Sequence, residues 1–255
     1  MMSLTNICKK YSKNIIRNLG YNIVPVQSTP ENWIKAMDIR TILDIGANVG
    51  QFAMNLHKLM PDSQIYSFEP IECCYNELLA NMKHIKKFKA FNFGLGDSKG
   101  EVEFYKNSFT PGSSILKISD LCKKAYPYTS ETEVQKILIH KLDDFAGQLE
   151  IVDNILIKID VQGYEDKVIK GGFETVIRAK VLIVETSFQE LYLGQPLFEN
   201  IYELLKDNFY YMGSLERARL NKSDCSPLFA DSIFINKNKG CLPKVIAGCV
   251  FGLHP

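Results

Sequence analysis

Short apolar runs recur along the chain, and most of them end in a polar turn followed by a helical pattern. Runs of this length bounded by turn residues are typical of buried strands, and strands that alternate with helices predict a parallel sheet with helices on both faces. We expect an antiparallel pair to close the sheet near the C-terminus. The predicted strands lie within residues 41–45, 64–68, 88–97, 101–106, 134–142, 155–160, 181–188, 209–212 and 232–235.

Length and charge favour one compact α/β domain. The chain has 255 residues and a formal net charge of +1, which argues against a nucleic-acid partner. We place the main domain at residues 31–240. The seven cysteines include no C-x-x-C pair, so we expect reduced thiols in a cytoplasmic protein, with neither a disulfide framework nor a bound metal.

The two ends of the chain differ from this domain. Residues 1–30 contain no acidic side chain, and their apolar positions recur at helical spacing between lysines and arginines. This segment reads either as a cap helix packed on the domain or as a weak contact with an anionic membrane through residues 1–20. Residues 241–255 form an apolar tail, in which 241–253 is too short to span a bilayer but offers a second peripheral contact.

The stretch TILDIGANVGQF, residues 41–52, predicts a strand, a tight turn and a helix start that together cradle a small molecule. A dinucleotide fingerprint places glycine where this chain has Asn48, and the acidic Asp44 would repel a pyrophosphate. The arrangement instead suits the cationic S-adenosylmethionine and resembles motif I of the class I methyltransferases. We expect cofactor contacts at Asp44, Gly46, Ala47, Asn48, Gly50 and Phe52, and at four later strand-end positions, Glu69, Pro70, Asp97 and Asp160.

Two further strand ends carry acids. Glu69-Pro70 follows the second strand about twenty residues beyond the first turn, the spacing at which nucleoside sites place an acid on the ribose hydroxyls. The alternative is a carboxylate that caps the helix that Pro70 starts. Asp97 follows the third strand, where it either accepts from an adenine amino group or only stabilises a turn.

A charged pair stands out in the strand ILIKID. Lys158 and Asp160 share one face by period two, and charges in a central strand are costly unless they are paired or functional. Asp160 is our preferred general base, with His140 and Glu185 behind it and Lys158 as its orienting partner. Structural alternatives are a Lys158–Asp160 pair that braces the turn and a Glu185 that caps its strand end. The polar insertion 107–133 is either a lid that brings Ser113 and Ser114 to the acceptor or a plain surface loop.

These segments together resemble the FkbM-type S-adenosylmethionine-dependent methyltransferases. The resemblance rests on TILDIGANVGQF, YSFEP, GLGDSKGEVEFY, HKLDDF, IKIDVQGYEDKVIKGG, VLIVETSFQELY and DSIFIN, in this order from about Arg40 to Asn236. It implies a Rossmann-like fold and O-methylation of a sugar, glycolipid or secondary-metabolite hydroxyl. The family commonly has Glu where this chain has Gln162, and a neutral amide cannot act as a base.

Two other functions compete with this one. A catalytically silent Rossmann-like scaffold in a polysaccharide-biosynthesis complex would bind cofactor without turnover, and Gln162 favours that reading. An NAD-dependent oxidoreductase would have the same kind of α/β fold, but Asn48 in place of a glycine disfavours this function.

Overall fold

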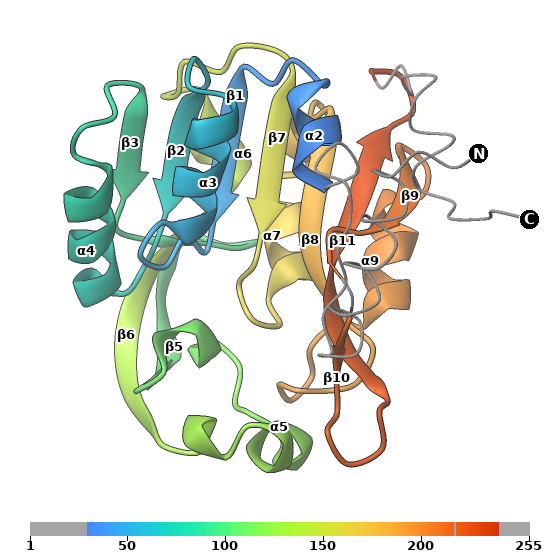
Figure 1. Cartoon of the computed structure of the whole chain (residues 1–255). Coiled ribbons are helices and arrows are strands. Elements are labelled where there is room, and N and C mark those ends of the chain that lie inside the picture. Colours follow the sequence, from blue (N-terminus) through green and yellow to red (C-terminus); the bar gives the residue numbers. More distant parts are fainter. Residues whose placement is uncertain (1–29, 217, 240–255) are drawn as a thin grey trace, which may run out of the picture.

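A computed structural model describes residues 30–216 and 218–239, and these form an open α/β sheet with two helical layers (Figure 1). The strand order is β10-β11-β8-β7-β1-β2-β3, with β9 paired to β11. Strands β1, β2, β3, β7 and β8 run parallel, whereas β9, β10 and β11 pair antiparallel, so the expected fold class is confirmed. The bounds are β1 (Thr41–Ile45), β2 (Gln64–Phe68), β3 (Phe88–Phe91), β7 (Ile155–Ile159), β8 (Val181–Ser187), β9 (Phe209–Ser214), β10 (Arg219–Leu220) and β11 (Pro227–Asn236).

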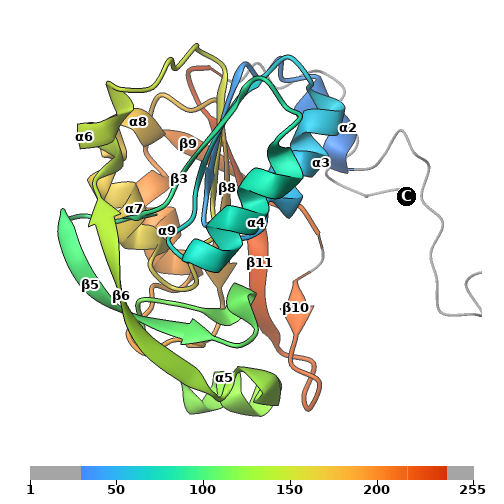
Figure 2. The ribbon, with the colours of Figure 1, turned by 90° about the vertical axis from the view of Figure 1, so that its left-hand side faces the viewer.

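Apolar side chains alternate across the central strands and build one core on each face of the sheet. Ile42 packs with α2 (Pro30–Lys35), α3 (Gln51–Leu59) and α4 (Glu72–Met82), whereas Leu43 packs on the opposite face. Figure 2 shows the two helical layers on either side of the sheet. The layer on the Leu43 face consists of α6 (Leu142–Ala146), α7 (Glu165–Gly171), α8 (Phe173–Val176) and α9 (Phe198–Leu205).

The strand order reverses between β1 and β7, because β2 and β3 follow on one side of β1 while β7 and β8 lie on the other. Ligands of open parallel sheets bind at such a point, outside the carboxyl ends of the strands. The two turns meet closely there, since the Asp160 N–H donates to the Ile45 carbonyl over 3.0 Å. The reversal thus places the turns after β1 and β7 side by side.

A second, three-stranded sheet lies beyond the carboxyl ends of the main sheet (Figure 1). It consists of β4 (Gly94–Leu95), β5 (Gly100–Asn107) and β6 (Thr132–His140), in the order β4-β6-β5. The third strand was predicted within 88–97, with a turn at Gly94, Gly96 and Asp97. The structure differs at this turn, because β3 ends at Phe91 and Gly94–Leu95 form β4, which leaves the main sheet to pair with β6. The position of β4 depends on its pairing with β6, a contact between distant segments that no local sequence pattern predicts.

The insertion 107–133 contains the short helix α5 (Asp120–Ala125) and the 3₁₀ turns η2 (Thr110–Gly112) and η3 (Pro127–Thr129). Backbone hydrogen bonds from Ser119 to Leu191 and from Leu193 to Lys117 tie it to the loop before α9. Pro70 precedes α4 by two residues instead of starting it, and Ile71 is the N-cap.

The predictions for residues 1–29 and 240–255, including both membrane contacts, lie outside the described residues. Among the helices that the structure describes, none is both long and apolar enough to cross a bilayer. Cys73, Cys74, Cys122 and Cys225, the cysteines in this part of the chain, are free thiols.

Gly46 provides a direct test of the junction between β1 and β7. Its φ is +82°, and an added Cβ would lie 1.9 Å from the Asp160 carbonyl oxygen. We expect Gly46→Ala to lower the free energy of unfolding by at least about 3 kcal/mol, measured by urea denaturation. Gly194→Ala is the matched control because its φ is +77° with open space around the site, so it should lose only about 1 kcal/mol. Equal losses in the two variants would contradict the close approach.

Candidate functional site

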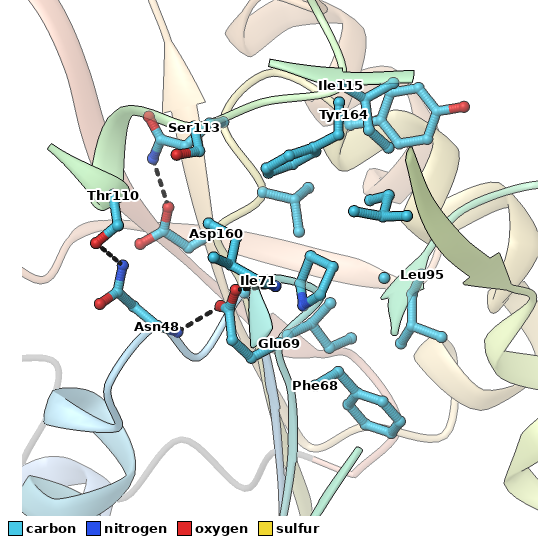
Figure 3. A pocket seen from close by; sticks show the side chains of 18 of the residues that line it. Asn48, Phe68, Glu69, Ile71, Leu95, Thr110, Ser113, Ile115, Asp160 and Tyr164 are labelled. Atoms are coloured by element: carbon cyan, nitrogen blue, oxygen red, sulfur yellow. Dashed lines mark hydrogen bonds between the residues drawn. The ribbon is translucent and has the colours of Figure 1, made fainter. Parts of the chain in front are cut away.

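A cleft of about 710 Å³ opens at the carboxyl edge of the sheet, between the main sheet and the small one. Figure 3 shows its polar side chains, including Asn48 and Asp160, opposite apolar ones such as Leu95 and Ile115. The apolar wall, which suits a flat heterocyclic base, consists of Phe68, Ile71, Leu95, Phe104, Ile115 and Ile137.

The N–H groups in the turn after β1 form hydrogen bonds within the protein. Gly46 and Ala47 donate to the Phe68 carbonyl, and Gly50 donates to the Ala47 carbonyl. Asn48, with a φ of +48°, donates its N–H to Glu69 Oε2, and its own Oδ1 accepts from the Val49 N–H. Phosphate groups bind to such N–H groups, and those of Gly46, Ala47, Asn48, Val49 and Gly50 are already engaged within the protein.

Glu69 is 4% exposed at the floor of the cleft, where its two oxygens accept from the N–H groups of Asn48 and Ile71, each over 2.8 Å. Burial raises the pKa of this carboxyl to about 7, although the two N–H donors lower it. Each oxygen keeps a second lone pair for a hydroxyl. Both sequence interpretations therefore have a geometric basis: Glu69 braces the start of α4 and also faces the cleft.

Beneath the cleft, a row of polar side chains crosses the α2–α4 face of the sheet. Asp44 pairs in register with Ser67 of β2 and Lys158 of β7, and Glu185 pairs with Asp231 of β11. Lys158 is the only buried lysine or arginine among the described residues. The cluster therefore carries an excess of carboxyl groups, a setting that favours a cationic ligand.

Asp44 is fully buried, and neither of its oxygens has a hydrogen-bond partner among the described residues. Burial raises its pKa to about 6, against the opposing effect of Lys158. Burial acts to lower the pKa of Lys158, but the carboxylates of Asp160, Asp231 and Asp44 raise it above its ordinary value. Lys158 is thus a permanent cation, and its Nζ lies 5.1 Å from the centre of the Phe52 ring.

Asp160 lines the cleft and is bound from two sides. Its Oδ2 accepts from Lys158 Nζ over 2.5 Å, and its Oδ1 accepts from the Gln162 side-chain amide over 2.7 Å. The same amide donates to Glu185 Oε2 over 2.7 Å. Burial, together with the charges of Asp160 and Glu165, raises the pKa of Glu185 well above its usual range. The predicted Lys158–Asp160 pair is present, with Glu185 one contact behind the cleft wall.

Several predicted site residues have other surroundings. Asp97 does not line the cleft, because its carboxylate pairs with Lys167 over 3.1 Å. His140 packs against the rings of Phe93 and Phe145 and does not reach the cleft. Ala47 and Gly50 belong to the turn and Phe52 to α3, and none of the three lines the cleft. The missing side chain of Gly50 leaves room for Leu78.

The insertion reaches the cleft through Thr110, which accepts from the Asn48 side-chain amide over 3.2 Å. Ser113 accepts from the Asn107 N–H, and Ser114 donates to the Gln162 carbonyl over 2.6 Å. Both predicted serine hydroxyls therefore hold the protein's own backbone. Pro70 lines the cleft as predicted.

Sequence reasoning missed three polar residues at this site. Glu165 is 3% exposed and accepts from the N–H groups of Val161 and Gly163, which fixes the turn after β7. Tyr192 donates its hydroxyl to Gln162 Oε1 over 2.8 Å. Only Asp231 left a signal, since it alternates with Ile233 and Ile235 on the buried face of its strand.

The reversed strand order and the excess of carboxyl groups beneath the cleft are typical of an α/β protein that holds a cationic ligand at the carboxyl edge of its sheet. Comparison with known families gives a match to the methyltransferase FkbM domain over residues 44–212. The chain therefore belongs to the FkbM methyltransferase family and is an S-adenosylmethionine-dependent methyltransferase.

Two relatives with similar sequences are described as methyltransferases. The 2-O-methyltransferase NoeI of Sinorhizobium fredii is 29% identical over 170 residues, which cover 64% of this chain and 70% of NoeI. The methyltransferase sdnD of Sordaria araneosa is 27% identical over 185 residues, or 62% of this chain and 66% of sdnD. Among solved structures, an S-adenosylmethionine-dependent methyltransferase from Aquifex aeolicus has 15% identity and a TM-score of 0.39, with 88% of this chain and 98% of that chain covered.

The buried Glu165 gives a pH prediction. Burial raises its pKa from 4.5 to about 7, so the folded protein holds this proton between about pH 4.5 and 7 while the unfolded chain releases it. The free energy of unfolding should therefore fall as the pH rises through this window and level off above it. We expect this fall in the free energy of unfolding to be reduced in Glu165→Gln, by an amount on the order of 3 kcal/mol, in urea titrations from pH 4.5 to 8. The exposed Glu174→Gln should keep the wild-type slope, and an unchanged slope in Glu165→Gln would refute the assignment.

Proposed function

We propose that this protein transfers a methyl group from S-adenosylmethionine to a hydroxyl of a sugar, glycolipid or secondary metabolite. The observation that carries the proposal is the group of carboxyls beneath the cleft around Lys158, the only buried lysine or arginine among the residues that the structure describes. Since S-adenosylmethionine carries an ammonium and a sulfonium, this charge balance complements it. The 2-O-methyltransferase relative NoeI supports a hydroxyl acceptor.

Each part of the cofactor has chemically complementary residues in the cleft or directly beneath it. The open lone pairs of Glu69 suit the ribose hydroxyls, and the apolar wall with Leu95 suits adenine. The carboxyl of Asp44, which has no hydrogen-bond partner within the described part of the chain, precedes the Gly46 turn, where a nearby ammonium would balance its charge. When bound, the cofactor supplies an electrophilic methyl on a sulfur that leaves as a neutral thioether.

The chain's own task is to position two substrates and to remove one proton. Well-oriented reactants gain up to roughly 7 to 11 kcal/mol from positioning. Asp160 is the preferred base because it lines the cleft and is fixed by Lys158 and Gln162. His140 has no part in this scheme, since its ring packs away from the cleft.

Calorimetric titration with S-adenosylmethionine, S-adenosylhomocysteine and NAD tests the cofactor assignment, and transfer of labelled methyl to a panel of mono- and oligosaccharides tests the acceptor. We expect micromolar binding of the two sulfur ligands, no binding of NAD, and a product that carries an O-methyl group by mass spectrometry. Cofactor binding without transfer to any hydroxyl would instead support the silent scaffold.

Glu69→Gln should weaken S-adenosylmethionine binding by about 1 to 3 kcal/mol, because one carboxylate oxygen becomes a donor and loses its acceptor role toward the ribose. Calorimetric dissociation constants measure the change. Glu72→Gln, an exposed acid at the start of α4, is the control and should bind as the wild type does. An unaltered constant in Glu69→Gln would end the ribose assignment.

Asp160→Asn should reduce turnover on the order of a hundredfold or more, because an amide cannot take the acceptor proton. Its dissociation constant for S-adenosylmethionine should stay within a few-fold of the wild type, which separates the chemical step from binding. Asp166→Asn, a change in the surface pair with Lys170, is expected to keep full turnover. Wild-type turnover in Asp160→Asn would exclude Asp160 as the base.

A further inference from the structure

The side chain of Gln162 joins Asp160, the proposed base, to Glu185. Its Nε2 donates to Asp160 Oδ1 and to Glu185 Oε2, each over 2.7 Å. Its Oε1 accepts from the Tyr192 hydroxyl over 2.8 Å, so every polar atom of the amide is engaged. The opposite orientation of the amide would turn its oxygen toward the two carboxyl groups and its nitrogen toward the tyrosine.

The backbone holds this amide in an unusual conformation. Gln162 has a φ of +55°, which costs free energy in a residue other than glycine and persists only where the surroundings enforce it. Ser114 binds the Gln162 carbonyl, and Glu165 binds the N–H groups on both sides, at Val161 and Gly163. Contacts from the insertion and from α7 therefore determine where the amide points.

We propose that Gln162 is a positioning residue that holds Asp160 and Glu185 as a fixed pair through a donor that does not titrate. This inference rests on the proposed methyl transfer to a hydroxyl. It gives a function to the position at which this chain departs from the glutamate common in the family. The amide thus joins one oxygen of Asp160, which lines the cleft, to one oxygen of Glu185, which lies behind the cleft wall.

A glutamate at this position would behave differently. It could donate a hydrogen bond only while protonated, and above its pKa three carboxylates would face one another. An amide donates at every pH, so the pair keeps its geometry in alkaline solution. The titratable groups around the amide are Lys158 from β7, Asp160 from the turn after it, Glu165 from α7, Glu185 from β8, Asp231 from β11 and Tyr192 from the loop before α9.

The first experiment needs no acceptor. The protein is labelled with ¹³C at the glutamate carboxyl, and Glu185 is assigned by the Glu185→Gln variant and titrated by NMR. In Gln162→Met, which keeps the bulk but removes the donor, we expect the Glu185 titration to move upward by about 1 to 2 pH units, because the ionised form loses a hydrogen bond. Gln189→Met is the control, since that amide donates to Ser226 and the Pro227 carbonyl, and it should leave Glu185 unchanged. An unmoved titration in Gln162→Met would overturn the proposal.

The second experiment compares Gln162→Glu with the wild type in methyl transfer to whichever saccharide of the panel is methylated, from pH 6 to 9. We expect turnover within about threefold of the wild type at pH 6 and a ratio that falls about tenfold per pH unit above the pKa of the new carboxyl. A residue that only supported the fold would lower turnover by the same factor at every pH, and that result would count against the proposal. If the wild type methylates no hydroxyl, the proposed function fails, while the NMR titration still decides the role of Gln162.

Discussion

The buried ammonium of Lys158 is the interaction on which the site depends. It lies on the central strand β7, in register with Asp44 and in contact with Asp160, at the edge where the strand order reverses. Without this cation, the neighbouring carboxyl groups would repel one another in a region that water hardly reaches. With it, the protein keeps an excess of carboxyl groups at one edge of the sheet. That excess is costly for the empty fold and favourable for a ligand with two positive charges.

The walls of the cleft come from two different parts of the fold. The tight turn at Gly46 brings the ends of β1 and β7 together, and Glu69 locks that turn by accepting the Asn48 N–H. Together with the bonds to the Phe68 and Ala47 carbonyls, this contact engages N–H groups of the turn that a pyrophosphate would otherwise use. The small sheet and the insertion then cover the apolar side of the cleft. The site thus combines a rigid floor from the main sheet with a wall from an added sheet.

Gln162 illustrates how one amide can organise a group of acids. Its position beyond β7 lets it reach Asp160 on its own turn and Glu185 on the next strand. Because burial raises the pKa of Glu185 while Lys158 pairs with Asp160, the two acids have different environments although they share one donor. Pairs of acids separated in this way are a common basis for dividing proton transfer between two groups. Tyr192 and Ser114 anchor the amide from segments far away in the sequence.

The sequence by itself determined most of the strand and helix order, the tight turn at Gly46, the strand-end positions of Glu69 and Asp160, and the Lys158–Asp160 pair, because apolar periodicity and strand-end position are local properties. Tertiary structure alone decided that β4 leaves the main sheet, that Asp97 pairs with Lys167, and that His140 packs on Phe93. It also decided that Asp231, Glu165 and Tyr192 join the site. These outcomes depend on strand register and on contacts between distant segments, whose free energy appears only when the chain has closed on itself.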